Sequence, residues 1–347
     1  MHFPGPIRDK TMHNRSHFVS RQDCLFGLAC YDQINQADAD RFQIPNGISC
    51  KYKECGAPSN SESAREQWER CWDDSALDFL KESPRVILPP CVPNLMAREV
   101  LPAFARYNVI AAKITDIGGF LSFNPSKLDK WRQRYGIPRR TTVLIHQESL
   151  DKVQEKIASV IESGKFFDLA RRLGSNLIFG APGYSVYDDD SMCPIKQVAN
   201  LRTSLLHAAL ANRAGLLSIP TIGWNKSRPR DIEFIAEWLR RQGSKVNTLA
   251  VNAQTGTHST KLCEELTEGI LEIERQASRE FHWVVFGGRK RIETIVQAIP
   301  RDRITQVSRP KDFQIPLVAR DGSMKVQYLF DLHVADVKGQ RLGSSRS

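Results

Sequence analysis

The sequence contains no apolar stretch long enough to cross a lipid bilayer. Its longest apolar runs, at 216–222 and 283–286, fall far short of the roughly 20 residues that a membrane-spanning helix needs. The first ten residues contain Pro4, Pro6 and Arg8 and no apolar centre, which is unlike a secretory signal. We therefore expect a cytoplasmic protein with no membrane partner.

The chain also lacks internal repeats, low-complexity segments and basic tracts interleaved with aromatic residues. Stacking on single-stranded nucleic acid is therefore not indicated. The 347 residues are 41% hydrophobic and 25% charged, which is typical of a globular protein and enough for one large domain plus extensions. The 49 basic and 39 acidic residues give a net charge of +10, which favours phosphate-bearing ligands or nucleic acid as partners.

From residue 84 onward, short apolar runs of strand length alternate with longer amphipathic stretches of helix length. Strands that alternate with helices pair in parallel, and eight of them predict an α/β fold of the (β/α)8 TIM-barrel type. The alternative, an open doubly wound sheet, would place a glycine-rich phosphate loop after its first strand, but residues 89–93 are Pro-Pro-Cys-Val-Pro. We expect the strands at 85–89, 109–115, 142–146, 176–180, 216–222, 248–252, 282–286 and 304–307. We expect the helices at 95–104, 126–135, 149–173, 195–214, 229–241, 259–278 and 290–298.

The pattern divides the chain into three parts. Residues 1–83 form an irregular, cysteine-containing N-terminal extension in which apolar residues at helical spacing predict one helix at 63–81. Residues 84–312 form the barrel. Residues 313–347 form a C-terminal β-hairpin, with strands at 316–320 and 324–331, and a polar tail.

Two titratable residues follow strands of the predicted barrel, whose working residues lie at the carboxyl ends of the strands. Asp116 ends an otherwise uncharged run after Lys113 and precedes two glycines, so it is a candidate acid, base or nucleophile. It is equally suited to capping its own turn. His146 follows four apolar residues and is a candidate general base or metal ligand, or a core-edge histidine that is bonded to a carbonyl.

A glycine pair follows the seventh predicted strand and suits an anion. Gly287 and Gly288 let a ligand approach the backbone, and Arg289 begins a helix whose free N–H groups favour phosphate. Arg309, after the eighth strand, can add charge from the adjacent loop. The alternative is a tight turn followed by a solvated basic run.

Other polar residues at strand ends are candidates for recognising the substrate. Trp224 can stack on a planar ligand such as a base while Asn225 bonds to it, although packing at the rim explains Trp224 equally well. Tyr184, Asn252 and Gln254 complete this predicted substrate-binding set.

Five of the eight cysteines precede residue 75, which is unlike a disulfide scaffold in a chain of this size. Cys24 and Cys30 form one closely spaced pair, and Cys50 and Cys55 form another. Four thiolates can hold zinc or an iron–sulfur cluster. The five-residue gap in the first pair is outside the usual range for zinc, so free cysteines remain the alternative.

A series of short motifs runs through the centre of the chain. They are Tyr-Ser-Val-Tyr at 184–187, Asn-Leu-Arg at 200–202, Ile-Pro-Thr-Ile-Gly-Trp at 219–224 and Phe-Gly-Gly at 286–288. In their order and spacing, residues 140–290 resemble a family of bacterial and phage proteins of unknown function. This resemblance implies a phage or mobile-element protein and carries no activity with it.

A second resemblance lies at 115–120, Thr-Asp-Ile-Gly-Gly-Phe. This run is similar to the Asp-Ser-Gly-Gly-Phe motif of queuine tRNA-ribosyltransferases, which are barrels that exchange bases in nucleic acid. The likeness implies that Asp116 serves in base exchange. Ile117 stands in place of the serine, strand 304–307 has no second aspartate, and no cysteine follows Cys263 to form that family's zinc motif.

Two functions follow from these observations. The first is a barrel enzyme that acts on a phosphate-bearing substrate, such as a nucleotide or nucleic acid, with base- or glycosyl-directed chemistry at Asp116. The second is a non-catalytic nucleic-acid-binding or accessory protein of a phage or mobile element, which the scarcity of carboxylates at the strand ends favours.

Overall fold

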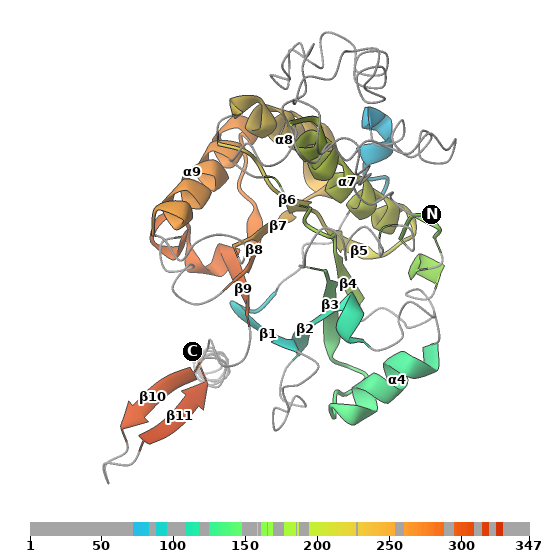
Figure 1. The fold of residues 1–347 in the computed structure, drawn as a ribbon, viewed down its shortest axis with the longest axis vertical. Helices are drawn as coiled ribbons and strands as arrows, with labels where there is room; N and C mark the ends of the chain where they lie inside the picture. The colour runs from blue at the N-terminus through green and yellow to red at the C-terminus, as the bar shows by residue number, and fades with distance from the viewer. Residues whose placement is uncertain are drawn as a thin grey trace, which may run out of the picture.

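The computed structural model describes part of the chain. The described residues are 72–82, 88–95, 108–117, 125–147, 158, 161–164, 166–168, 177–184, 186, 194–226, 228–253, 260–287, 295–308, 314–318 and 324–328. They include the nine strands of the central sheet and four long helices around it (Figure 1).

Parallel strands curl into a barrel, as the alternation of strands and helices predicts. The strands are β1 (Cys91–Leu95), β2 (Val109–Lys113), β3 (Thr142–His146), β4 (Leu177–Gly180), β5 (Leu217–Ile219), β6 (Thr221–Ile222), β7 (Thr248–Asn252), β8 (His282–Phe286) and β9 (Ile304–Ser308). Their order in the sheet is β5-β4-β3-β2-β1-β9-β8-β7-β6. The two ends of this order meet at Pro220, because β5 and β6 are one stretch of chain that this proline interrupts. The (β/α)8 fold is confirmed.

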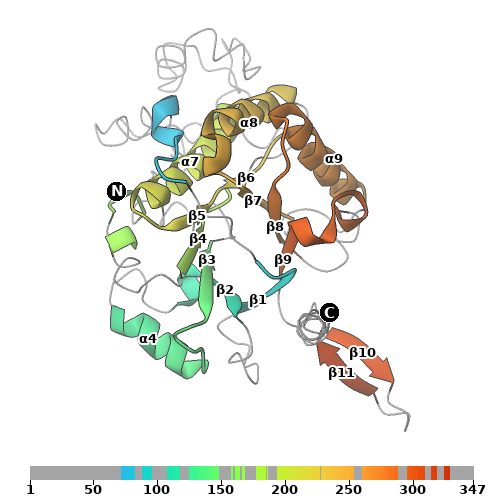
Figure 2. The ribbon, with the colours of Figure 1, turned by 180° about the vertical axis from the view of Figure 1, so that it is seen from behind.

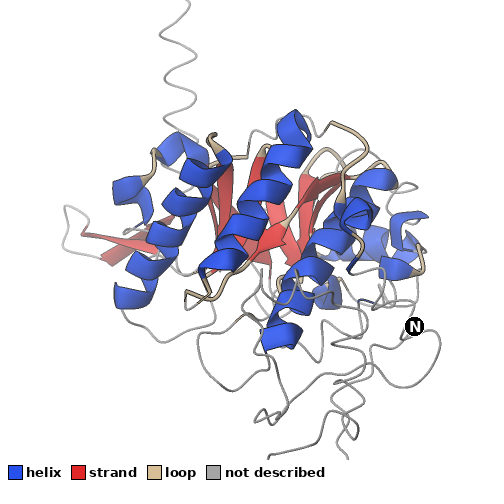
Figure 3. Ribbon diagram, turned by 90° about the horizontal axis from the view of Figure 1, so that it is seen from above, coloured by secondary structure: helices blue, strands red, loops and turns tan. Residues whose placement is uncertain are grey.

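Helices lie outside the strands, as Figure 3 shows from above. The long ones are α4 (Pro125–Arg134), α7 (Pro194–Arg213), α8 (Pro229–Gln242) and α9 (Thr260–Ala277). Helix α8 begins with Pro229, whose fixed φ suits a first helical position, and it ends before Gly243, which takes a φ of +54°. Phe234 and Trp238, one turn apart, are fully buried, so this stripe faces the barrel.

Alternate residues of each strand belong to two separate cores. Ile110 and Ala112 of β2 pack outward against the helices, whereas Val109 and Ala111 pack inside the barrel. The inner core consists of Leu88, Val92, Val109, Ala111, Leu144, Ile178, Ile219, Ala250, Val284, Phe286 and Val307. Because the two faces alternate strictly, the position of a residue in its strand decides whether its side chain enters the barrel.

The first described strand lies six residues later than the strand predicted at 85–89. Residues 85–87 lie outside the described residues, and residues 88 and 89 are not in a strand, so the predicted bounds are wrong there. Strand β1 runs through the proline-rich segment that sequence reasoning assigned to a loop. Pro93 is tolerated because it stands where β1 changes partner: residues up to Pro93 pair with β9, and Asn94 begins the pairing with β2. Cys91 and Asn94 are therefore strand residues rather than loop residues.

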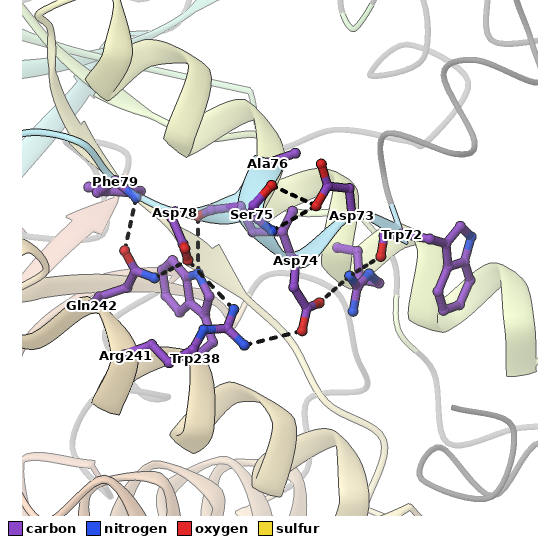
Figure 4. Close-up of polar contacts among 12 residues, drawn as sticks. Trp72, Asp73, Asp74, Ser75, Ala76, Asp78, Phe79, Trp238, Arg241 and Gln242 are labelled. Atoms are coloured by element: carbon purple, nitrogen blue, oxygen red, sulfur yellow. Dashed lines mark hydrogen bonds and ion pairs between the residues drawn. The ribbon is translucent and has the colours of Figure 1, made fainter. Parts of the chain in front are cut away.

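The predicted helix at 63–81 is wrong where the structure describes it. Residues Asp74–Leu77 form a short 3-10 helix that Asp73 caps, and the chain is extended after it. Phe79 is fully buried while Leu80 is 67% exposed, so the apolar pattern that suggested a helix does not persist. This segment docks on α7 and α8 (Figure 4), where the Trp238 indole N–H donates to the Leu77 carbonyl over 3.1 Å.

The predicted C-terminal hairpin is confirmed. Strands β10 (Gln314–Val318) and β11 (Met324–Tyr328) pair antiparallel, with Pro316 opposite Val326. The hairpin stands clear of the barrel strands in both Figure 1 and the reverse view of Figure 2. Among the described residues, no helix is both long enough and apolar enough to cross a membrane.

Candidate active site at the carboxyl end of the barrel

The inner face of the barrel changes from apolar to polar at the carboxyl ends of its strands. The last inner positions of β1, β2, β3 and β7 are Asn94, Lys113, His146 and Asn252, and two residues earlier the same strands carry Val92, Ala111, Leu144 and Ala250. Burying polar side chains is unfavourable unless they are bonded. A polar layer at this end is typical of a TIM-barrel active site.

His146 is the best-defined member of this layer. Its side chain is fully buried, and its Nε2 lies 3.1 Å from Oδ1 of Asn94. Its ring stacks on Phe286, with ring centroids 4.6 Å apart and planes 25° apart. These three residues come from β1, β3 and β8, the first, third and seventh strands of the barrel counted along the chain, and so form one layer across its interior.

The surroundings of His146 determine its protonation. Burial, assisted by the nearby charge of Lys113, lowers the pKa of His146 to about 3, so the imidazole is neutral at neutral pH. Oδ1 of Asn94 can only accept a hydrogen bond, so Nε2 carries the proton and donates it. The lone pair is then on Nδ1, which has no hydrogen-bond partner among the described residues.

Asp116 follows β2 in a short 3-10 turn, Ile114–Asp116, at the same end of the barrel. Partial burial raises the pKa of its carboxyl, and the charge of Lys113 opposes that rise. Lys113 pairs in register with His146 on the neighbouring strand. The charge of one half-buried lysine thus acts on both predicted catalytic residues, Asp116 and His146.

Sequence reasoning missed Lys113 and Asn94 as site residues. A signal for Lys113 was present, because Val109, Ala111 and Lys113 occupy alternate positions of one strand and so share a face. Asn94 follows the first predicted strand, at the end of the barrel where working residues lie, but no feature of the local sequence singles it out.

Two of the predicted substrate-binding residues are tied to the outer helices. The indole of Trp224 lies against the backbone of α9, where a Cβ placed on Gly269 would be 2.2 Å from the ring. Asn225 is buried: its backbone N–H donates to Asp231 over 3.0 Å, and its side chain donates to Gln197 over 3.1 Å. These contacts hold the loop after β6 in place.

Tyr184 is also turned toward the helix layer. Its backbone N–H donates to the Ser204 hydroxyl of α7 over 3.3 Å, and its ring centroid lies 5.8 Å from that of His207. His207 is itself paired with Glu162 over 3.0 Å, and both side chains are buried. The loop after β4 is therefore anchored on α7 through Tyr184.

Gly287 directly follows β8 in a closely packed position. Its N–H donates to the Val307 carbonyl over 3.1 Å, and an added Cβ would lie 3.1 Å from that of Ala253. The other predicted ligand residues lie outside the described residues: Gln254, Gly288, Arg289 and Arg309, and the candidate metal ligands Cys24, Cys30, Cys50 and Cys55. Within the part of the chain that the structure describes, no three metal-binding side chains gather.

Comparisons with protein-family models, with curated proteins and with solved structures found no match. The resemblances to a bacterial and phage family and to queuine tRNA-ribosyltransferases therefore stay predictions. The function has to be argued from the residues at the carboxyl end of the barrel.

Proposed function

We propose that this chain is an enzyme that acts on a phosphate-bearing substrate, a nucleotide or nucleic acid, at the carboxyl end of its barrel. The observation that carries the proposal is the buried polar layer around His146, whose Nδ1 has no partner among the described residues. Most buried polar groups in folded proteins are bonded. A polar exception inside the barrel, at the end where barrel enzymes hold their substrates, supports a ligand site.

The charges in this layer favour an anion. Lys113 contributes a positive charge from the inner face, and its influence reaches both His146 and Asp116. The net charge of +10 adds a long-range attraction for phosphate. We assign Lys113 to binding the anionic part of the substrate.

Asp116 is the group proposed to carry the chemistry as acid, base or nucleophile. A carboxyl whose pKa is raised moves toward the pH at which it can both give and take a proton. His146, with a pKa of about 3, is too weak a base for that task and serves as a neutral hydrogen-bond acceptor. This division leaves proton transfer to Asp116 and binding to Lys113 and His146.

The test is turnover of ribonucleotides and tRNA, with released base measured by chromatography. In the Asp116→Asn variant we expect kcat to fall by about 100-fold or more, because this variant retains the shape of the side chain but cannot transfer the proton. In Lys113→Met we expect mainly KM to rise. Asp302→Asn, at an exposed position before β9, is the matched control.

Full activity of the Asp116→Asn variant would rule out Asp116 as the group that carries the chemistry. Binding of nucleic acid that weakens steeply with salt, without turnover, would instead support the non-catalytic accessory protein.

A further inference from the structure

The unpartnered nitrogen of His146 differs from the other unpartnered atoms on the described strands because it lies inside the barrel. Nδ1 of His146 is the one buried side-chain atom without a hydrogen-bond partner on the inner face of the described strands. Ser218 and Ser308 have such atoms too, but alternation places both outside the barrel. An unsatisfied buried acceptor is unfavourable, so a bound group is expected to satisfy it.

That group must be a hydrogen-bond donor. The bond from Nε2 to Asn94 leaves the lone pair on Nδ1, and stacking on Phe286 fixes the plane in which the lone pair points. A metal ion is also attracted to a lone pair, but here the charge of Lys113 opposes a second cation. A hydroxyl or N–H group of a ligand has no such conflict.

The residues beside His146 on the two neighbouring strands further restrict which ligand can bind there. On one side, Lys113 stands at the same level of the barrel and offers a positive charge. On the other side, Gly180 of β4 adds no side chain, and a Cβ there would lie 3.4 Å from that of His146. A ligand at this place therefore has a donor group for Nδ1 close to an anionic oxygen for Lys113.

We infer that the site takes a sugar phosphate, with a sugar hydroxyl donating to Nδ1 of His146 and a phosphate oxygen bound by Lys113. The inference rests on the proposed function and narrows it, because a phosphate without a neighbouring hydroxyl leaves His146 unsatisfied. It also makes His146 a specificity-determining residue that distinguishes hydroxylated from plain phosphate esters.

The experiment compares two ligands of equal ring size by calorimetry on the full chain. Ribose 5-phosphate has ring hydroxyls, and cyclopentylmethyl phosphate has none. We expect ribose 5-phosphate to bind about tenfold more tightly or better, because only its hydroxyl satisfies the acceptor. His146→Phe, which keeps the aromatic stack, should abolish this preference, and Lys113→Met should weaken both ligands.

A second measurement needs no variant and so does not depend on the variants folding. The 15N resonance of His146 Nδ1 moves when that atom accepts a hydrogen bond. We expect ribose 5-phosphate to shift it at pH 7 and inorganic phosphate to leave it unchanged.

The outcomes separate this inference from the proposed function. Equal affinity for the two esters, with an unmoved Nδ1 resonance, overturns the inference while phosphate binding still stands. No binding of any phosphate, or tighter binding of gluconate as a hydroxylated carboxylate, overturns both. A shift of the Nδ1 resonance with zinc alone shows a metal ligand and also overturns the inference.

Discussion

The indole of Trp224 occupies the space beside α9 that a side chain at Gly269 would fill. A Cβ at this glycine would stand 2.2 Å from Cζ2 of the indole and 2.4 Å from its Nε1, closer than any real contact. The glycine weakens the helix, since glycine is about 1 kcal/mol less favourable than alanine in a helix interior. The packing of Trp224 against this position explains why α9 has a glycine there.

We predict that Gly269→Ala lowers the free energy of unfolding by about 2 kcal/mol, because the rigid indole has to move. Urea denaturation followed by tryptophan fluorescence measures it. In a Trp224→Leu background the same change should have the opposite sign and stabilise by about 1 kcal/mol, through helix propensity alone. Gly223→Ala, where a Cβ meets Val186 at an ordinary 3.5 Å, is the control. Equal effects of Gly269→Ala in both backgrounds would contradict the packing argument.

A second prediction concerns the segment that docks on α7 and α8. The Asp74 carboxylate contacts Arg241 over 3.1 Å (Figure 4) and Arg202 over 2.5 Å. The guanidinium carbon of Arg202 lies 5.2 Å from the ring centroid of Trp72 and 4.9 Å from that of Phe234. We expect Asp74→Asn to destabilise the protein by about 1–3 kcal/mol, because it removes a negative charge that is bonded to the buried guanidinium of Arg202.

The readout for Asp74→Asn is urea unfolding combined with limited proteolysis. Cleavage near residues 72–82 should become faster than in the unaltered chain, because the segment detaches more often. Asp302→Asn, at an exposed position, should change neither measurement by more than about 0.5 kcal/mol or its equivalent in rate. An unchanged cleavage pattern in Asp74→Asn would show that the other contacts of the segment, such as the Trp238–Leu77 hydrogen bond, hold it without the charge of Asp74.

A third prediction follows from the pKa of about 3 at His146. Between pH 6.5 and 3 the unfolded chain binds a proton at this residue and the folded chain does not. The titration of His146 therefore leaves the free energy of unfolding unchanged above pH 6.5. Below that pH it lowers the free energy of unfolding by about 1.4 kcal/mol per pH unit. Urea unfolding at pH 7, 6 and 5 should show this slope.

In His146→Gln the contribution of this histidine to the pH dependence of unfolding should disappear. The difference in free energy of unfolding between the unaltered chain and the variant should therefore narrow as pH falls. His282→Gln is the matched control, because it removes an inner-face histidine from the amino end of the barrel. If the unaltered chain and His146→Gln gave parallel curves, the histidine would not be buried and neutral.

Several parts of the fold were predictable from local sequence. Strands β3, β7 and β8 have the bounds that their apolar runs predict, because a barrel strand is buried on both faces and so appears as one continuous apolar segment. β1 was misplaced because its prolines are typical of a loop; only its two barrel neighbours make Pro93 acceptable in a strand.

The candidate site was predictable only in outline. That Asp116 and His146 lie at the same end of the barrel followed from parallel pairing alone. Trp224 and Asn225, which the sequence presented as ligand contacts, pack against or bond to the outer helices instead. Two of these partners, Gln197 of α7 and Gly269 of α9, are distant in sequence.

By itself, the sequence determined the number of barrel strands, their parallel direction and the end of the barrel at which polar side chains gather. These follow from apolar periodicity and chain connectivity, which are local properties. Only the tertiary structure decided that Asn94 meets His146 from 52 positions away, that Phe286 stacks on the same ring, and that Lys113 lies beside it. The physical reason is closure: residues of separate strands become neighbours in the barrel interior only when the sheet curls and its edges meet at Pro220.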